Sequence, residues 1–173
     1  ENLTLSLNIT PEELGEDRFA ADFAALIGRS DIAPQRLMLE ITEDLLLRNL
    51  PQAASALKAL RGLGFRTALD DFGAGFCNFR YLRELPLDAL KLDKAMVEGV
   101  PADATALAVL RAIIALAKAL GLAVYAEGIE DEIQRAAITA EGCDYWQGFL
   151  RAQPMPSERV VALARTARGM GHG

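Results

Sequence analysis

Polar residues follow a series of short apolar stretches that have the composition of β-strands. Carboxylate and amide oxygens are the ligands that hard cations such as Mg²⁺ and Mn²⁺ take in proteins. In a barrel of strand–helix units, the carboxyl ends of the strands meet on one face, and active sites lie there. The series therefore predicts a metal-dependent active site made from successive strand ends. Its members are Asn8, Glu40, Asp70, Asp71, Lys91, Glu127 and Gln147.

Asp70 and Asp71 form the most specific part of this series, and they precede the glycine-containing stretch 72–75. By itself an Asp–Asp pair before glycine is typical of a turn, because an Asp side chain accepts hydrogen bonds from its own backbone. Adjacent carboxylates at a strand end point in different directions, so one can bridge two cations while the other completes the second site. Two divalent cations about 3.5–4 Å apart stabilise the attacking and leaving oxygens of phosphoryl transfer. The pair therefore favours hydrolysis of a phosphodiester.

Glu40 and Lys91 each interrupt an apolar strand, where an unpaired charge is costly to bury. Glu40 has two interpretations: an ion pair with a buried arginine, or a metal ligand. Lys91 could pair with Asp93, which lies two residues later on the same face. Alternatively, its ammonium could orient a metal-bound water or support phosphate charge.

Glu127 and Glu130 flank a turn after the strand at 122–126, and Gln147 follows the last strand. Glu130 and Gln147 each have a purely structural interpretation beside a role in the active site. Glu130 could be no more than a helix N-terminal residue favoured by the helix dipole, and Gln147 could be a buried hydrogen-bond donor. The single histidine, His172, excludes a histidine-rich zinc site. The chain has no Ser–His or Cys–His arrangement, so covalent nucleophilic catalysis is disfavoured.

The bulk composition is that of a globular domain, with 51% apolar and 24% charged residues. A net charge of −6 argues against a DNA- or RNA-binding protein. No stretch predicts a membrane span or a secretory signal. Cys77 and Cys143 fall at opposite ends of their strands, so we expect free thiols, which suit the cytoplasm.

Strand and helix patterns alternate along the chain and must position these residues. A capping box at 10–13 starts the first helical segment. The alternation predicts parallel strand–helix units in one α/β domain. Because site residues follow all six strands, we favour a (β/α)8 barrel over an open sheet, and we expect two further strands in a segment before residue 1. Strands are expected at 3–8, 36–42, 65–70, 87–93 and 122–126, and a further strand with its loop at 143–150. Helices are expected at 17–28, 50–63, 79–84, 103–120, 130–141 and from 157, with a short helical turn that begins at Thr42.

The chain resembles the EAL-domain cyclic di-GMP phosphodiesterases over essentially its whole length, 1–173. The resemblance implies a TIM-like barrel that hydrolyses cyclic di-GMP to the linear dinucleotide pGpG with two Mg²⁺ or Mn²⁺ ions. It also implies a homodimer, with sensory or GGDEF-type domains in the full-length protein. The ordered segments that carry it are LNIT at 7–10, EITE at 40–43, DDFGAGF at 70–76, LPLDALKLD at 85–93, AEGIED at 126–131 and GCDYWQGFL at 142–150.

The resemblance also implies roles for individual residues. Asn8, Glu40 and Asp70 would hold the first metal, with Asp70 bridging to the second. Asp71 and Glu127 would hold the second metal. The remaining candidates are Lys91, which would contact the catalytic water, Glu43, which would hold the 71–78 loop in shape, and Asp93, Glu130 and Gln147, which would surround the bound ions.

The sequence departs from the family in two places. The Glu-Ala-Leu segment that supplies another metal ligand is missing, and it belongs on a strand before residue 1. The loop has Ala74, Phe76, Cys77 and Asn78 where the family more often has Thr, Tyr, Ser and Ser. Two alternatives to the enzyme therefore stay open. One is a non-catalytic EAL domain that binds cyclic di-GMP or a protein partner, and the other is a purely structural barrel.

Overall fold

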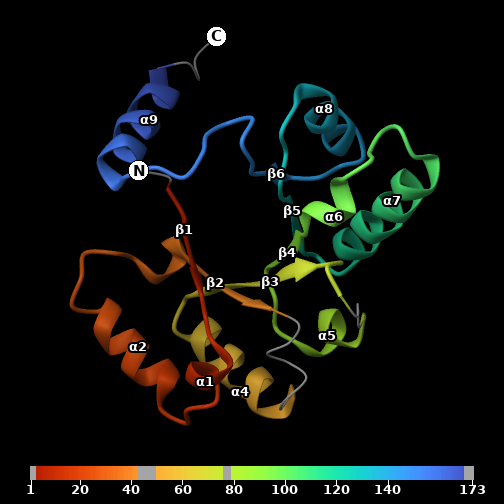
Figure 1. Cartoon of the computed structure of the whole chain (residues 1–173). Coiled ribbons are helices and arrows are strands. Elements are labelled where there is room, and N and C mark those ends of the chain that lie inside the picture. Colours follow the sequence, from red (N-terminus) through yellow and green to blue (C-terminus); the bar gives the residue numbers. More distant parts are fainter. Residues whose placement is uncertain (1–2, 43–49, 76–78, 170–173) are drawn as a thin grey trace.

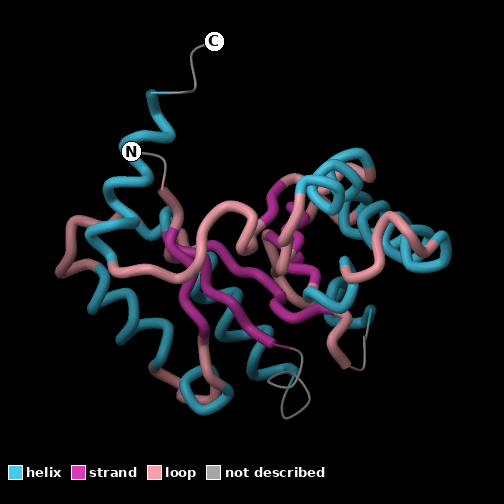
Figure 2. The backbone as a smooth tube through the Cα atoms, turned by 45° about the horizontal axis from the view of Figure 1, so that its top comes forward, coloured by secondary structure: helices cyan, strands magenta, loops and turns pink. Residues whose placement is uncertain are grey.

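The computed structural model describes residues 3–42, 50–75 and 79–169. Its centre is a six-stranded parallel sheet in which the strands follow one another in chain order. The sheet curls, and the helices lie around its outer side (Figures 1 and 2). The strands are β1 (Leu5–Asn8), β2 (Leu37–Thr42), β3 (Arg66–Phe72), β4 (Ala89–Leu92), β5 (Ala123–Ala126) and β6 (Tyr145–Trp146).

Helices connect successive strands, as the alternating pattern predicts, and the fold is a partial TIM-like (β/α)8 barrel. Among the described residues, no helix has both the length and the apolar character needed to cross a bilayer. The helices are α1 (Pro11–Leu14), α2 (Phe19–Ile27), the 3-10 turn η1 (Pro34–Arg36), α4 (Leu50–Gly62), α5 (Phe79–Glu84), α6 (Lys94–Val97), α7 (Ala104–Ala119), α8 (Glu132–Ala140) and α9 (Ser157–Gly169).

The predicted capping box is confirmed, and a second side-chain cap is found at the start of α7. At the predicted capping box, the backbone N–H of Thr10 donates to Oε2 of Glu13 at 2.8 Å, and the N–H of Glu13 donates to Oγ1 of Thr10 at 3.3 Å. Helix α7 begins after Asp103, whose Oδ1 accepts the N–H of Thr105 at 2.7 Å. Each contact satisfies a backbone donor that a helix start leaves without a partner.

The structure differs from the expected elements in several places. The helix expected at 130–141 begins at Glu132, because Asp131 caps it by accepting the N–H of Gln134 at 2.7 Å. Within the strand-and-loop segment expected at 143–150, the strand itself is only two residues long. Helix α6 was not expected at all. The helical turn expected after Thr42 lies outside the described residues, as does Cys77, whereas Cys143 is a free thiol.

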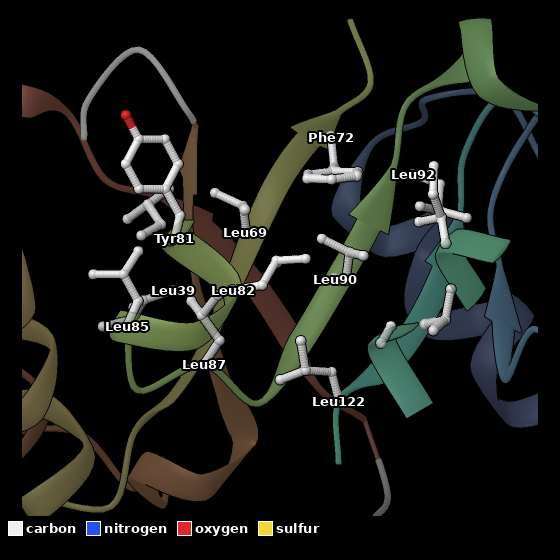
Figure 3. Close-up of a cluster of buried hydrophobic side chains, with 14 of the residues drawn as sticks. Leu39, Leu69, Phe72, Tyr81, Leu82, Leu85, Leu87, Leu90, Leu92 and Leu122 are labelled. Atoms are coloured by element: carbon white, nitrogen blue, oxygen red, sulfur yellow. The ribbon is translucent and has the colours of Figure 1, made fainter. Parts of the chain in front are cut away.

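The hydrophobic core lies between the outer face of the sheet and the helices. Leu69 and Leu90 point from neighbouring strands toward Leu82 of α5 in Figure 3, and all three are buried. On the concave face, Met38, Ala68 and Ala89 form a second, smaller cluster. Glu40, Asp70 and Lys91 follow two residues later on the same three strands.

Two aspartates at the amino ends of the strands hold neighbouring strands together. Oδ2 of Asp88 accepts the buried N–H of Thr67 at 2.9 Å, and its Oδ1 pairs with Arg61 of α4 at 2.8 Å. Asp144 repeats the arrangement two strands later: its Oδ2 accepts the N–H of Val124 at 2.8 Å, and its Oδ1 pairs with Lys118 of α7. Each aspartate thereby ties a strand to its neighbour and to an outer helix.

Candidate functional site

Lys91 lies at the centre of the site with a buried ammonium group. Its Nζ is 2.8 Å from Oε2 of Glu40, 2.8 Å from Oδ1 of Asp70 and 2.6 Å from Oε1 of Glu127. The three carboxylates come from β2, from β3 and from the residue after β5. Among the described residues, Glu40 thus forms an ion pair with a lysine rather than with an arginine, and Lys91 pairs with these three carboxylates rather than with Asp93.

A β-bulge places Asp70 and Asp71 opposite the single residue Lys91. Leu69 pairs in register with Leu90, and the next pair joins residues 72 and 92, so β3 has one residue more than β4 in this interval. Asp71 adopts a φ of +54° there, a left-handed conformation that Asp tolerates better than most residues. Side chains next to each other on a regular strand point to opposite faces. The bulge accounts for how both carboxylates can face one site.

Three carboxylates converge at this point. One oxygen each from Asp70, Asp71 and Glu127 lies within 4.8 Å of the other two. Glu40, which also contacts Lys91, adds a fourth carboxylate to the group. Four acidic groups therefore face one ammonium, an arrangement that suits added positive charge.

The protonation of the site follows from burial and from these contacts. Burial lowers the pKa of Lys91, but its close contacts with the carboxylates of Asp70, Glu127 and Glu40 outweigh this effect and raise the pKa overall, so the ammonium keeps its proton. Burial raises the pKa of Glu127, and Lys91 opposes that rise. Burial, followed by repulsion from Asp70 and Asp93, raises the pKa of Asp71. The acidic groups thus repel one another in the absence of further cations.

Two buried carboxylate oxygens in this cluster lack a hydrogen-bond partner: Oε1 of Glu40 and Oδ1 of Asp70. Oδ1 of Asp70 is close enough to Lys91 for an ion pair, although the geometry is not that of a hydrogen bond. Buried polar atoms are nearly always satisfied in native proteins, so each exception calls for an explanation. Hard divalent cations would satisfy both oxygens, and the donor set therefore fits Mg²⁺ or Mn²⁺.

Two other predicted residues lie beside the cluster. Asn8 ends β1 and pairs in register with Glu40 of β2, which places it at the same end of the sheet. Gln147 follows β6, and its Nε2 donates to Oε1 of Glu127 at 2.7 Å. Gln147 is therefore a hydrogen-bond donor to the site, although it is exposed rather than buried.

The remaining predicted residues lie farther from the cluster or outside the described residues. Asp93 caps α6, where its Oδ1 accepts the N–H of Ala95 at 2.8 Å. Glu130 pairs with Nζ of Lys94 at 2.6 Å. Glu43 is not among the described residues. Lys94 was not among the predicted site residues. The one feature of the sequence that points to it is its place directly after the segment LKLD at 90–93.

A cavity of about 660 Å³ opens beside the acidic cluster. Glu127 and Gln147 form part of its wall, together with the Lys94–Glu130 pair. Apolar side chains from the segment after β6 and from α9 complete the lining: Phe149, Met155, Val160 and Leu163. The site thus combines an acidic end with an apolar wall.

Known proteins resemble this chain along most of its length. Residues 1–154 match the EAL domain family. The cyclic di-GMP phosphodiesterase NbdA of Pseudomonas aeruginosa is 36% identical over 168 residues, which cover 97% of this chain and 22% of NbdA. The cyclic di-GMP phosphodiesterase RocR of the same organism is 35% identical over 159 residues, which cover 92% of this chain and 41% of RocR. The chain therefore spans well under half the length of either relative.

Solved structures show the same arrangement of elements. The EAL domain of Mycobacterium smegmatis DcpA has a TM-score of 0.90 at 32% identity, over 95% of this chain and 74% of that chain. The manganese and cyclic di-GMP complex of Klebsiella pneumoniae BlrP1 has a TM-score of 0.83 at 27% identity, over 88% of this chain and 39% of that chain. The sequence match and the shared fold agree with each other, and the chain belongs to the EAL domain family.

Proposed function

We propose that this domain hydrolyses cyclic di-GMP to the linear dinucleotide pGpG with two bound Mg²⁺ or Mn²⁺ ions. One observation carries the proposal: Asp70, Asp71 and Glu127 converge within 4.8 Å, in a cluster that holds two buried oxygens without hydrogen-bond partners. The names of NbdA and RocR, and the manganese and cyclic di-GMP in the BlrP1 complex, support this choice of substrate and metal.

Five side chains of the site would be the ligands of the two ions. Asp70 would hold both ions, Asn8 and Glu40 would be further ligands of the first ion, and Asp71 and Glu127 would be ligands of the second. Bound divalent cations supply transition-state charge stabilisation and lower the pKa of a bound water.

Lys91 and Gln147 support this acidic set. Because the pKa of Lys91 is raised, its ammonium stays charged at neutral pH, so it acts as a fixed positive charge rather than as a base. Gln147 holds Glu127 in place through their hydrogen bond. In this proposal Glu43 and Asp93 fix the segments around the site.

The proposal extends to the setting of the domain. The domain would act in the cytoplasm as a homodimer, in a polypeptide that also carries sensory or GGDEF-type domains. The larger size of the relatives supports the presence of further domains, because this chain spans 22% of NbdA and 41% of RocR.

Incubation with cyclic di-GMP tests the function directly. The protein is mixed with Mg²⁺ or Mn²⁺, with and without a chelator, and the products are separated by chromatography. We expect pGpG that disappears with the chelator. Substitution Asp70→Asn should lower turnover by at least about a hundredfold, since even partners of metal ligands contribute 10- to 100-fold. The exposed Asp22→Asn serves as the control.

Two outcomes would contradict the proposal. Near-normal turnover in Asp70→Asn would remove the bridging role of that carboxylate. Tight binding of cyclic di-GMP without any product would instead favour the non-catalytic receptor.

A further inference from the structure

Helix α6 is anchored to the end of β3. It follows β4 directly, and the N–H of Asp93 donates to the backbone oxygen of Phe72 at 3.1 Å. The side chain of Asp93 then caps the helix at the N–H of Ala95. The position of this short helix is therefore fixed by the two strands that carry Asp70 and Lys91.

Lys94, the first residue of α6, lies against the backbone that follows Glu127. Gly128 has a φ of +68°, and a Cβ added there would lie 2.6–2.9 Å from Cγ, Cβ and Cδ of Lys94. The aliphatic stem of Lys94 therefore packs on the peptide directly after the acidic residue. Only glycine leaves room for this approach and adopts this conformation freely.

The ammonium of Lys94 reaches the other end of the same turn. Its Nζ lies 2.6 Å from Oε1 of Glu130, and about half of each side chain is exposed. An ion pair this exposed contributes little to stability. Its chief effect is therefore geometric, because it joins the residue after β4 to the turn after β5.

Glu127 depends on neighbours of this kind for its place. Its backbone N–H donates to the oxygen of Leu92 at 3.0 Å, where β5 ends, so the ladder between β4 and β5 no longer guides the chain beyond it. Its side chain must still reach Lys91 at 2.6 Å and Gln147 at 2.7 Å. A misplacement of about 1 Å at such a group lowers turnover by as much as about a hundredfold.

The same helix contacts the other acidic segment. Gly73 has a φ of +104°, and a Cβ there would lie 2.2 Å from Cγ of Met96. Gly73 is two residues after Asp71. Helix α6 thus lies between the two turns that carry acidic residues, with Met96 against one and Lys94 against the other.

We propose that Lys94 is a positioning residue for Glu127, which it holds in place by packing on Gly128 and pairing with Glu130. The proposal rests on the hydrolase function proposed above. It assigns the role to a residue that is not itself a member of the acidic cluster.

Three variants, each made in the full-length protein, separate the effect of the charge of Lys94 from that of its bulk. Lys94→Met keeps an apolar stem over Gly128 and removes the ion pair. Lys94→Arg keeps the charge, and Lys94→Glu combined with Glu130→Lys reverses the pair. The control is Arg111→Met, which breaks a pair between Arg111 of α7 and Glu141 after α8, with distances of 2.6 and 2.7 Å.

The measurements are kcat, KM, Mn²⁺ affinity by calorimetry and the melting temperature. For Lys94→Met we expect kcat and Mn²⁺ affinity to fall by about tenfold, KM to change by less than about threefold, and the melting temperature to shift no more than in the control. Lys94→Arg and the reversed pair should recover at least about half of the lost kcat, because the ion pair is restored.

Either of two results would overturn the proposal. One is a Lys94→Met variant with the kcat and Mn²⁺ affinity of the parent. The other is a loss accompanied by a fall in melting temperature well beyond that of the control, which would make Lys94 a stability residue. If the parent itself forms no pGpG, the proposed function fails, and the Mn²⁺ affinities still decide the role of Lys94.

Discussion

Replacing Lys91 with methionine should destabilise the metal-free protein strongly. Methionine keeps most of the volume of the side chain and removes the ammonium. Three carboxylates lie 2.6–2.8 Å from that ammonium, and the exposed side-chain fraction is 6% for Lys91, 6% for Glu40, 11% for Asp70 and 17% for Glu127. The substitution therefore leaves buried negative charges that face one another without a counter-charge.

The size of the effect follows from this geometry. Removing one partner of a buried ion pair costs about 3–5 kcal/mol, a large share of the roughly 5–15 kcal/mol by which native domains are stable. With a urea dependence of about 2 kcal/mol per molar, the unfolding midpoint should fall by about 1.5–2.5 M. Mn²⁺ should reduce the difference in unfolding midpoint between Lys91→Met and the parent, because a bound cation supplies the missing positive charge.

The stability that Lys91→Met loses relative to the parent should also depend on pH, through the titration of Glu127. Burial raises the pKa of Glu127 above its ordinary 4.5, and Lys91 opposes the rise. Without Lys91 the folded-state pKa rises further, so the folded protein binds a proton more tightly than the unfolded chain does. Stability then falls as pH increases through this range. The deficit is therefore largest above the folded-state pKa and shrinks as pH falls toward 4.5.

The fluorescence of Trp146, the single tryptophan of the chain, reports the unfolding. Urea titrations are run with a chelator and with Mn²⁺, at several pH values. Lys58→Met, at an exposed position on α4, is the control and should shift stability by less than about 0.5 kcal/mol. A midpoint for Lys91→Met within about 0.3 M of the parent in chelator at neutral pH would show that Lys91 is not the counter-ion of the cluster.

Two further predictions concern stability and involve no member of the acidic cluster. Asp88→Ala should lower the free energy of unfolding by about 1–3 kcal/mol, because it leaves the buried N–H of Thr67 without an acceptor. Urea unfolding measures this loss, and calorimetry should show an unchanged Mn²⁺ affinity. A weakened Mn²⁺ site would contradict a purely local role of Asp88. Gly73→Ala should lower the melting temperature because the new Cβ meets Met96 and φ is +104°. Adding Met96→Ala should relieve the clash but not the backbone strain, so equal melting temperatures for the single and double variants would refute this account.

Local sequence signals predicted most of the fold. The capping box joins Thr10 to Glu13, and the cap of α7 joins Asp103 to Ala106, so each contact lies within three residues. Contacts this local depend on residues that are neighbours in the sequence. Helix α5 has the expected bounds. Helix α6 was not predicted because its four residues are too few to show a helical period. The bounds of β6 inside the expected strand-and-loop segment 143–150 could not be predicted, because apolar residues continue beyond the strand.

The site was predicted as a set of residues but not as an arrangement. Strand ends identified Glu40, Lys91 and Glu127, since charges stand out among apolar neighbours. Their mutual contacts join residues as far as 51 positions apart, and they depend on the register of the sheet. The bulge that brings Asp71 beside Asp70 is likewise a property of strand pairing, which no local pattern records.

The order of the strands has a consequence for how the chain folds during synthesis. Among the residues that the structure describes, each strand pairs with the strands before and after it in the sequence, so these ladders join consecutive strand–helix units. An emerging chain can therefore add one unit at a time to an existing edge, and Asp88 and Asp144 secure their units by contacts with the preceding one. We expect early units to be ordered on the ribosome before β6 has been translated, and the acidic cluster to become complete only when β5 delivers Glu127.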